Sequence, residues 1–250
     1  MIFRFVISLT LLMLLSEIQA QSFKKDQLRY SRVRTAYAEK ESSVLLLLSD
    51  AGLEKSSFNI YLRAFKQEKE IELWAKDVNS TKFSLLKTYK VCATCGELGP
   101  KRQQGDLQIP EGYYHIDRFN PASNFYLSLG INYPNASDKI LGTKGKLGGD
   151  IFIHGACVTI GCLPITDDQI KELYVFCIEA RNHGQTTIPV SIFPTKLTDK
   201  NYQALINENS SSVDCLNLWK DLKKGFDIFD KTKLPPNVSF LRNGRHHIGD

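Results

Sequence analysis

The chain contains 250 residues, 42% of them hydrophobic, and carries a formal net charge of +5. This length and composition suffice for one sizeable hydrophobic core, with or without an added subdomain. The basic residues are spread along the chain without a dense run or a nucleic-acid-binding motif. We therefore expect no nucleic-acid partner, whereas contact with an anionic polymer or surface is allowed.

Residues 1–20 have the features of a signal peptide. Arg4 supplies a short positive region, and residues 5–15 form an apolar run that is too short to span a bilayer comfortably. Small and polar residues then lead to a cleavage site before Gln21. An uncleaved N-terminal anchor is the alternative. Since no second stretch resembles a membrane-spanning helix, we expect an exported protein of the periplasm or cell envelope, without a membrane span after signal removal.

Residues 21–58 predict an N-terminal helical segment of one or two helices, with a break at residues 50–52. Apolar and polar side chains then alternate with the period of β-strands. Strands are predicted at residues 59–65, 70–76, 83–91, 113–118, 124–130 and 188–193. We therefore expect a mainly β domain of the α+β class over residues 59–195, arranged as an antiparallel barrel or sandwich and flanked by helices.

A helix is predicted to begin after Thr166, which with Gln169 forms a capping box. Apolar residues at helical spacing follow, and the helix should end near His183. Residues 196–250 predict a C-terminal helical extension. Its pattern is helical to about Phe229, and we expect the tail from residue 235 to be loose.

Six cysteines occur in the chain, at positions 92, 95, 157, 162, 177 and 215. Export permits disulfides, and an even count allows three pairs, although a free nucleophile would leave at least one further thiol unpaired. Cys92 and Cys95 have the spacing of half a zinc site or of a redox pair. No second such pair and no βαβ context accompanies them, so we expect neither a metal site nor a cofactor. Cys177 lies on an apolar helix face and is expected in the core.

A histidine and a cysteine stand close together in the centre of the chain, each beside a glycine: His154-Gly155 and Gly161-Cys162. A thiolate is the nucleophilic form of cysteine, and a nearby imidazole can generate it. Glycine beside a nucleophile lets substrate and backbone N–H donors approach closely. A buried strand histidine beside a structural cysteine is the alternative that this spacing leaves open.

Together these residues resemble the active-site motif of the L,D-transpeptidase catalytic-domain (YkuD) family. His154-Gly155 matches its upstream half, and the Thr-x-Gly-Cys sequence of residues 159–162 matches the downstream half. Residues 96–101, Gly-Glu-Leu-Gly-Pro-Lys, resemble the YafK-like branch. Further similarity to that branch occurs at residues 105–106, 110–113, 133–136 and 166–167, and the likeness covers about residues 60–193.

Two positions depart from the wider family. Most members carry a second histidine where this chain has Ile160, and an arginine where it has Pro164. Both missing groups would help to bind substrate or stabilise an oxyanion. The YafK-like branch tolerates the changes, so the resemblance still implies an active enzyme.

The resemblance implies a closed β-sheet with the catalytic cysteine at one end, and a cysteine-dependent peptidoglycan L,D-transpeptidase. His154 would accept the Cys162 proton while held by a backbone carbonyl at Gly155, and N–H groups near Gly161 and Cys162 would hold the oxyanion. The thiolate would attack an amide beside the diamino acid of a stem peptide and form a thioester. An acceptor amine then gives transpeptidation, and water gives a carboxypeptidase or an amidase that releases a wall-bound peptide or protein.

Three further residues are expected to bind substrate: Thr159, Glu97 and Lys101. The alternatives are that Thr159 caps its turn and that the two charged residues brace their loop by ion pairs, with Asp106 as a candidate member. Peptidoglycan stem peptides, and in one variant a wall-linked protein, are the expected partners. A non-catalytic wall-binding module is the alternative function.

Overall fold

The computed structural model describes residues 23–249. The predicted signal peptide therefore lies outside the described residues. Within them, no helix combines the length and the apolar character needed to cross a membrane.

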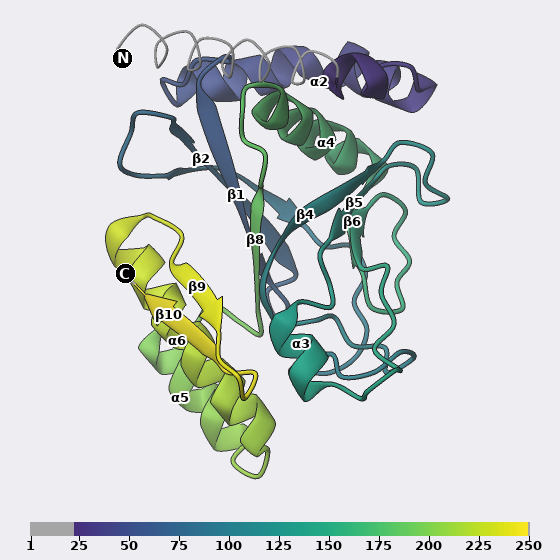
Figure 1. Cartoon of the computed structure of the whole chain (residues 1–250). Helices are drawn as coiled ribbons and strands as arrows, with labels where there is room; N and C mark the ends of the chain where they lie inside the picture. Colours follow the sequence, from purple (N-terminus) through teal and green to yellow (C-terminus); the bar gives the residue numbers. More distant parts are fainter. Residues whose placement is uncertain (1–22, 250) are drawn as a thin grey trace, which may run out of the picture.

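Eight strands form one mixed sheet that curls into a half-barrel, in the order β3-β2-β1-β8-β4-β5-β6-β7 (Figure 1). β1 pairs antiparallel with β2 but parallel with β8, and β4, β5 and β6 continue antiparallel. The strands are β1 (Phe58–Phe65), β2 (Glu70–Asp77), β3 (Ser84–Lys90), β4 (Gly112–Asn120), β5 (Ser128–Ile131), β6 (Phe152–His154), β7 (Leu163–Pro164) and β8 (Pro189–Phe193). The predicted α+β class with helices flanking the sheet is confirmed, but the predicted antiparallel arrangement is not complete, because β1 pairs in parallel with β8 and β6 with β7.

Both faces of the central strand β1 are covered, and its alternate side chains pack on different sides of the sheet. Ile60, Leu62 and Ala64 belong to the main core, which also contains side chains of the helices α2 (Ser31–Asp50) and α4 (Asp167–Asn182). The opposite face carries Tyr61 and Phe65, which pack with the C-terminal part of the chain. Alternate side chains of a strand point to opposite faces, so this one strand contributes to the packing on both sides of the sheet.

The helix α4 begins with the predicted capping box, in which the Thr166 hydroxyl accepts from Gln169 N and the Gln169 side chain accepts from Thr166 N. It packs beside α2 on one side of the sheet (Figure 1). The Tyr37 hydroxyl of α2 donates to buried Glu179 at 2.7 Å. The N-terminal helix is therefore built into the main core.

The C-terminal extension contains α5 (Asp199–Glu208), α6 (Val213–Thr232) and a hairpin of β9 (Asn237–Phe240) with β10 (His246–Gly249). The helices are as the pattern predicts, but the prediction of a loose tail is wrong. Ile248 of the hairpin is 3% exposed and packs in the same cluster as Trp219 of α6. The tail is ordered because this apolar side chain completes the second core.

The edges of the curled sheet, β3 and β7, meet just beyond β3. Cys92 N donates to the Pro164 carbonyl at 3.0 Å, and a disulfide joins Cys92 to Cys157. This contact closes the half-barrel at one point. Within residues 23–249 it is the one disulfide, since the other four cysteines are free, and Cys177 lies fully buried in the main core as predicted. A further helix, α3 (Ala136–Leu141), follows β5.

Candidate active site

The short strands β6 and β7 bring His154 and Cys162 onto one face. They pair in parallel, with Ile153 opposite Leu163 and His154 opposite Pro164. Cys162 immediately precedes Leu163, so extending the register by one residue sets it opposite Phe152 on the neighbouring strand. Because side chains alternate along a strand, Phe152 and His154 share a face. Cys162 therefore neighbours His154 diagonally.

Both side chains line a cavity of about 560 Å³, a size suited to a peptide segment. One wall comes from the segment between β4 and β5, and the opposite wall from the loop that precedes β7. The lining residues are Asn120, Ser123, Asn124, Phe125, Ser128, Asp150, Phe152, His154, Val158, Thr159, Ile160 and Cys162. Ile160, the position where the wider family carries a histidine, is 79% exposed at the rim.

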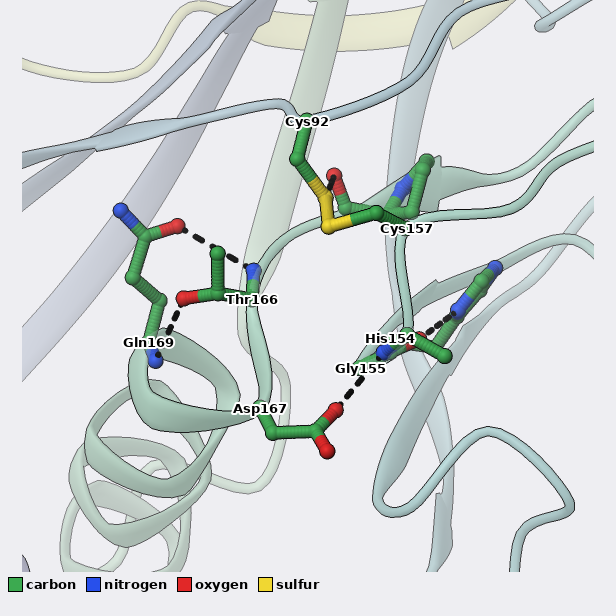
Figure 2. Close-up of a disulfide and its surroundings, with 9 residues drawn as sticks. Cys92, His154, Gly155, Cys157, Thr166, Asp167 and Gln169 are labelled. Atoms are coloured by element: carbon green, nitrogen blue, oxygen red, sulfur yellow. Dashed lines mark hydrogen bonds between the residues drawn. A yellow bond between two sulfur atoms is a disulfide. The ribbon is translucent and has the colours of Figure 1, made fainter.

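His154 is held in one orientation. Its side chain is 1% exposed, and Nδ1 lies 2.5 Å from the Gly155 carbonyl (Figure 2). A carbonyl only accepts hydrogen bonds, so Nδ1 carries the proton and Nε2 is left as the acceptor. Burial lowers the pKa of His154, with the Gly155 hydrogen bond acting in the opposite direction. The imidazole is therefore neutral at pH 7.

Gly155 has no room for a side chain. A Cβ there would lie 2.5 Å from Asp167 Oδ1 and 2.9 Å from the Phe125 carbonyl. The next residue, Ala156, has φ 57° and donates its N–H to Asp167 Oδ1 at 2.8 Å. The first turn of α4 thus anchors the loop directly after His154 (Figure 2).

The disulfide gives this loop a second anchor. Cys157 lies between His154 and Cys162 in the sequence and is bonded to Cys92 from beyond the opposite sheet edge (Figure 2). The anchor at Asp167 and the disulfide together restrict how the segment carrying both candidate catalytic residues can move.

Thr159 organises the turn before the cysteine. Its hydroxyl oxygen accepts from Gly161 N at 3.1 Å and from Cys162 N at 2.8 Å, and the hydroxyl donates to the Cys162 carbonyl at 2.9 Å. Gly161 has φ 140°, which favours glycine, and a Cβ would lie 3.0 Å from the Gln108 carbonyl. The two N–H groups expected to hold an oxyanion are thus bonded to Thr159 in this structure.

Cys162 is a free, half-buried thiol whose Sγ lies 3.6 Å from the Asp150 carbonyl. Burial raises the pKa of the Cys162 thiol. A backbone hydrogen bond and the charge of Lys101 lower it, whereas Cys95 and Asp150 raise it further. Cys162 and His154 therefore rest as a neutral thiol and a neutral imidazole rather than as an ion pair.

The other two predicted substrate-binding residues lie outside the cavity lining. Lys101 is 4% exposed, and its Nζ donates to Asp106 at 2.5 Å and to the Gln103 carbonyl at 2.9 Å. This is the bracing arrangement that the sequence left open, although the charge still acts on Cys162. Glu97 has an exposed side chain and takes part in the loop through its backbone.

Sequence reasoning missed the buried ion pair of Lys66 and Glu111. Lys66 Nζ lies 2.9 Å from Glu111 Oε1 and also donates to the carbonyls of Glu97, Gly99 and Ile109. Glu111 accepts from Gly99 N and from the Trp219 indole N–H. The pair thus joins the 96–101 motif to α6. A lysine directly after a largely apolar strand was the available signal, but its partner is 45 residues away.

Comparisons with a family model, a curated relative and a solved structure give the following matches. The family model described as L,D-transpeptidase catalytic domain (YkuD) matches residues 62–192. The Escherichia coli K12 protein named "Putative L,D-transpeptidase YafK" is 38% identical over 191 residues, which cover 76% of this chain and 73% of that protein. The structure of the helical cell shape determining protein Pgp2 from Campylobacter jejuni is 19% identical, with a TM-score of 0.44, and the match covers 79% of this chain and 80% of Pgp2.

Proposed function

Because the chain belongs to the L,D-transpeptidase catalytic-domain (YkuD) family, we propose that it is an acyl-transfer enzyme of peptidoglycan metabolism with Cys162 as nucleophile and His154 as general base. The observation that carries this proposal is the placement of both side chains on one face of the β6–β7 pair, within one cavity. The Gly155 carbonyl supports the assignment. It binds the N–H at Nδ1 and so leaves Nε2 free to accept the proton of the Cys162 thiol.

In the first step, Nε2 of His154 takes the proton of the Cys162 thiol, and Sγ attacks the amide carbonyl beside the diamino acid of a stem peptide. The tetrahedral intermediate collapses, the carbon–nitrogen bond breaks, and His154 returns the proton to the leaving amine. A thioester on Cys162 remains. An acceptor amine then attacks the thioester and forms a new amide, which is transpeptidation, whereas attack by water is hydrolysis.

The oxyanion needs a hydrogen-bond donor near Cys162. The N–H groups of Gly161 and Cys162 both point at the Thr159 hydroxyl oxygen, and the hydroxyl proton is given to the Cys162 carbonyl. Rotation of that O–H toward the cavity would supply a donor while both N–H bonds stay in place. We therefore assign Thr159 a contact with the reacting carbonyl oxygen. Gly161 allows the turn before Cys162 to pack closely against the Gln108 carbonyl.

Export to the cell envelope follows from the same proposal. Residues 1–20 have the pattern of a signal peptide, and peptidoglycan lies outside the cytoplasmic membrane. The E. coli relative carries the name "Putative L,D-transpeptidase YafK", which supports an amine acceptor. The test below distinguishes this proposal from two alternatives. One is a hydrolase on the same scaffold that releases a terminal residue or a wall-linked protein. The other is a non-catalytic wall-binding module.

The test incubates the purified protein with tetrapeptide muropeptides that contain a diamino acid and, separately, with intact sacculi. Cys162→Ala and His154→Gln serve as matched variants, and mass spectrometry identifies the products. A new cross-link or an exchanged terminal residue, absent with both variants, supports transpeptidation. Loss of a residue or release of a peptide without exchange identifies the hydrolase. Identical products from folded wild type and Cys162→Ala contradict the proposal.

A further inference from the structure

The segment between β4 and β5, residues 121–127, forms one wall of the cavity and touches the candidate base. Its Phe125 ring lies against the His154 ring, with centroids 4.6 Å apart and planes tilted by 32°. Phe125 is 41% exposed, whereas His154 is 1% exposed. The phenyl ring therefore stays partly exposed while it covers one face of the imidazole.

This segment is fastened by a side chain from outside the matched family region. Nη1 of Arg32, in α2, donates to the Ser123 carbonyl and to the Tyr126 carbonyl, the latter at 2.8 Å. These carbonyls flank Phe125 on both sides in the sequence. Arg32 thus fixes the backbone on each side of the ring that covers His154.

The Tyr126 side chain adds a second contact to the same helices. Its ring lies 5.6 Å from the Arg32 guanidinium and 5.8 Å from the Lys171 ammonium of α4, an arrangement typical of cation–π contacts. Tyr126 also has φ 70°, a conformation that a bulky residue adopts only when its surroundings hold it. The unusual backbone conformation in residues 121–127 thus occurs at the residue whose side chain contacts α2 and α4.

The helix that carries Arg32 is itself immobilised. Val33 and Ala36 are fully buried in the main core, and Lys40 Nζ lies 2.5 Å from Asp168 at the start of α4. Asp168 directly follows Asp167, which holds the loop after His154. α2 is therefore connected to the candidate site from two directions, through Arg32 and through the N-terminus of α4.

We propose that Arg32 and Phe125 are positioning residues for His154, so that the N-terminal helix determines the orientation and burial of the general base. The inference rests on the proposed function only in treating His154 as that base. Removal of either side chain would let the 121–127 segment move away and admit water to the imidazole. The base would then be poorly oriented and would resemble an ordinary solvated histidine.

The ionisable groups around His154 are few. Asp167 approaches from α4, and Asp150 and Cys162 share the cavity. Arg32 is bonded to carbonyls rather than to the imidazole, so its effect should pass through the position of Phe125 and not through its charge. Arg32→Lys keeps the charge but replaces the planar guanidinium with a shorter, more flexible side chain, and should therefore recover only part of what Arg32→Met loses.

Two readouts test the inference on the full chain. The first is an NMR pH titration of histidine labelled with carbon-13, with the His154 signal assigned through His154→Gln. The second is the rate of Cys162 alkylation by iodoacetamide at pH 7, with Cys95 and Cys215 replaced by serine. Arg34→Met is the matched control, since Arg34 lies two residues further along α2 and donates only to the nearby carbonyls of Leu28 and Arg29.

Arg32→Met and Phe125→Ala should each raise the His154 titration midpoint by about half a pH unit and slow alkylation at least about threefold. Phe125→Leu and Arg34→Met should stay close to wild type. The inference is overturned if folded Arg32→Met and Phe125→Ala titrate and react as Arg34→Met does. The titration, repeated in Cys162→Ala, does not depend on turnover. It therefore separates failure of this inference from failure of the proposed function, which an active Cys162→Ala would reveal.

Discussion

Two buried histidines occupy opposite parts of this molecule, and they differ in what surrounds them. His154 lies on β6 against the Phe125 ring, whereas His246 lies on β10 between the rings of Tyr113 and Phe240. Burial lowers the pKa of both, that of His246 to about 4. His154 opens into a cavity that holds a thiol. His246 Nε2 is buried without a hydrogen-bond partner among the described residues.

The difference shows that a buried, perturbed histidine is not by itself a catalytic group. Burial explains the lowered pKa of each, because the charged form loses hydration. Only His154 has a Nδ1–H fixed by a carbonyl and a neighbour with a proton to give. The perturbation at His246 instead reflects the packing of the C-terminal hairpin on the second core.

The largest expected effect separates the two histidines directly. His154→Gln should lower turnover by about 10³-fold, because general-base catalysis typically contributes 10²- to 10⁴-fold, and should change the melting temperature little. His246→Gln should leave turnover within about twofold and lower the melting temperature. Product formation from muropeptides and thermal unfolding of both variants measure these changes. Equal losses of turnover in the two would remove the distinction.

The next effect concerns the buried ion pair that connects the 96–101 motif of the catalytic domain to the C-terminal extension. Lys66→Met leaves Glu111 as an uncompensated buried charge between the 96–101 motif and Trp219 of α6. Breaking a buried pair in this way typically costs about 3–5 kcal/mol of the free energy of unfolding. Urea unfolding should show that loss, and Lys66→Met combined with Glu111→Leu should recover part of it. A double variant as unstable as the single one would argue against a buried charge as the cause.

The disulfide tests how strongly the loop after His154 depends on its anchor. Cys92→Ser with Cys157→Ser removes a cross-link that spans 65 residues, and loop-closure entropy limits the loss to about 4 kcal/mol. Turnover should also fall, since the loop between His154 and Cys162 gains freedom. The His246 region should be unaffected, and hydrogen exchange of β10 is the control. Altered exchange there would show that the two regions are not independent.

The smallest effect is the dependence on pH, where the two histidines act on different quantities. His246 binds fewer protons when folded than when unfolded, so stability is full above about pH 6.5 and falls as the pH drops toward about 4, by on the order of 3 kcal/mol. His154, whose pKa is also lowered, should place the ascending limb of the pH–rate profile below pH 6.5. His246→Gln should make the free energy of unfolding less dependent on pH. It should leave the ascending limb of the pH–rate profile unchanged.

Local sequence patterns predicted much of this protein. The period of two in the side chains identified β1 as a strand, although both of its faces are buried, and the capping box at Thr166 and Gln169 marked the start of α4. The spacing of His154 and Cys162 with the surrounding glycines suggested a candidate site, and the resemblance to the family motif favoured it over a structural histidine and cysteine. Each of these signals depends on residues that are near one another in the chain, where propensity and periodicity act.

The tertiary structure alone decided the contacts between distant segments. The sequence allowed three disulfides, and only the closure of β3 against β7 selected Cys92 with Cys157. It left open whether Lys101 braces a loop, and it predicted a loose tail where Ile248 packs in a core. It contained no local signal that Arg32 reaches the segment covering His154. These pairings depend on which surfaces the folded sheet brings together, and no pattern within a single segment encodes that choice.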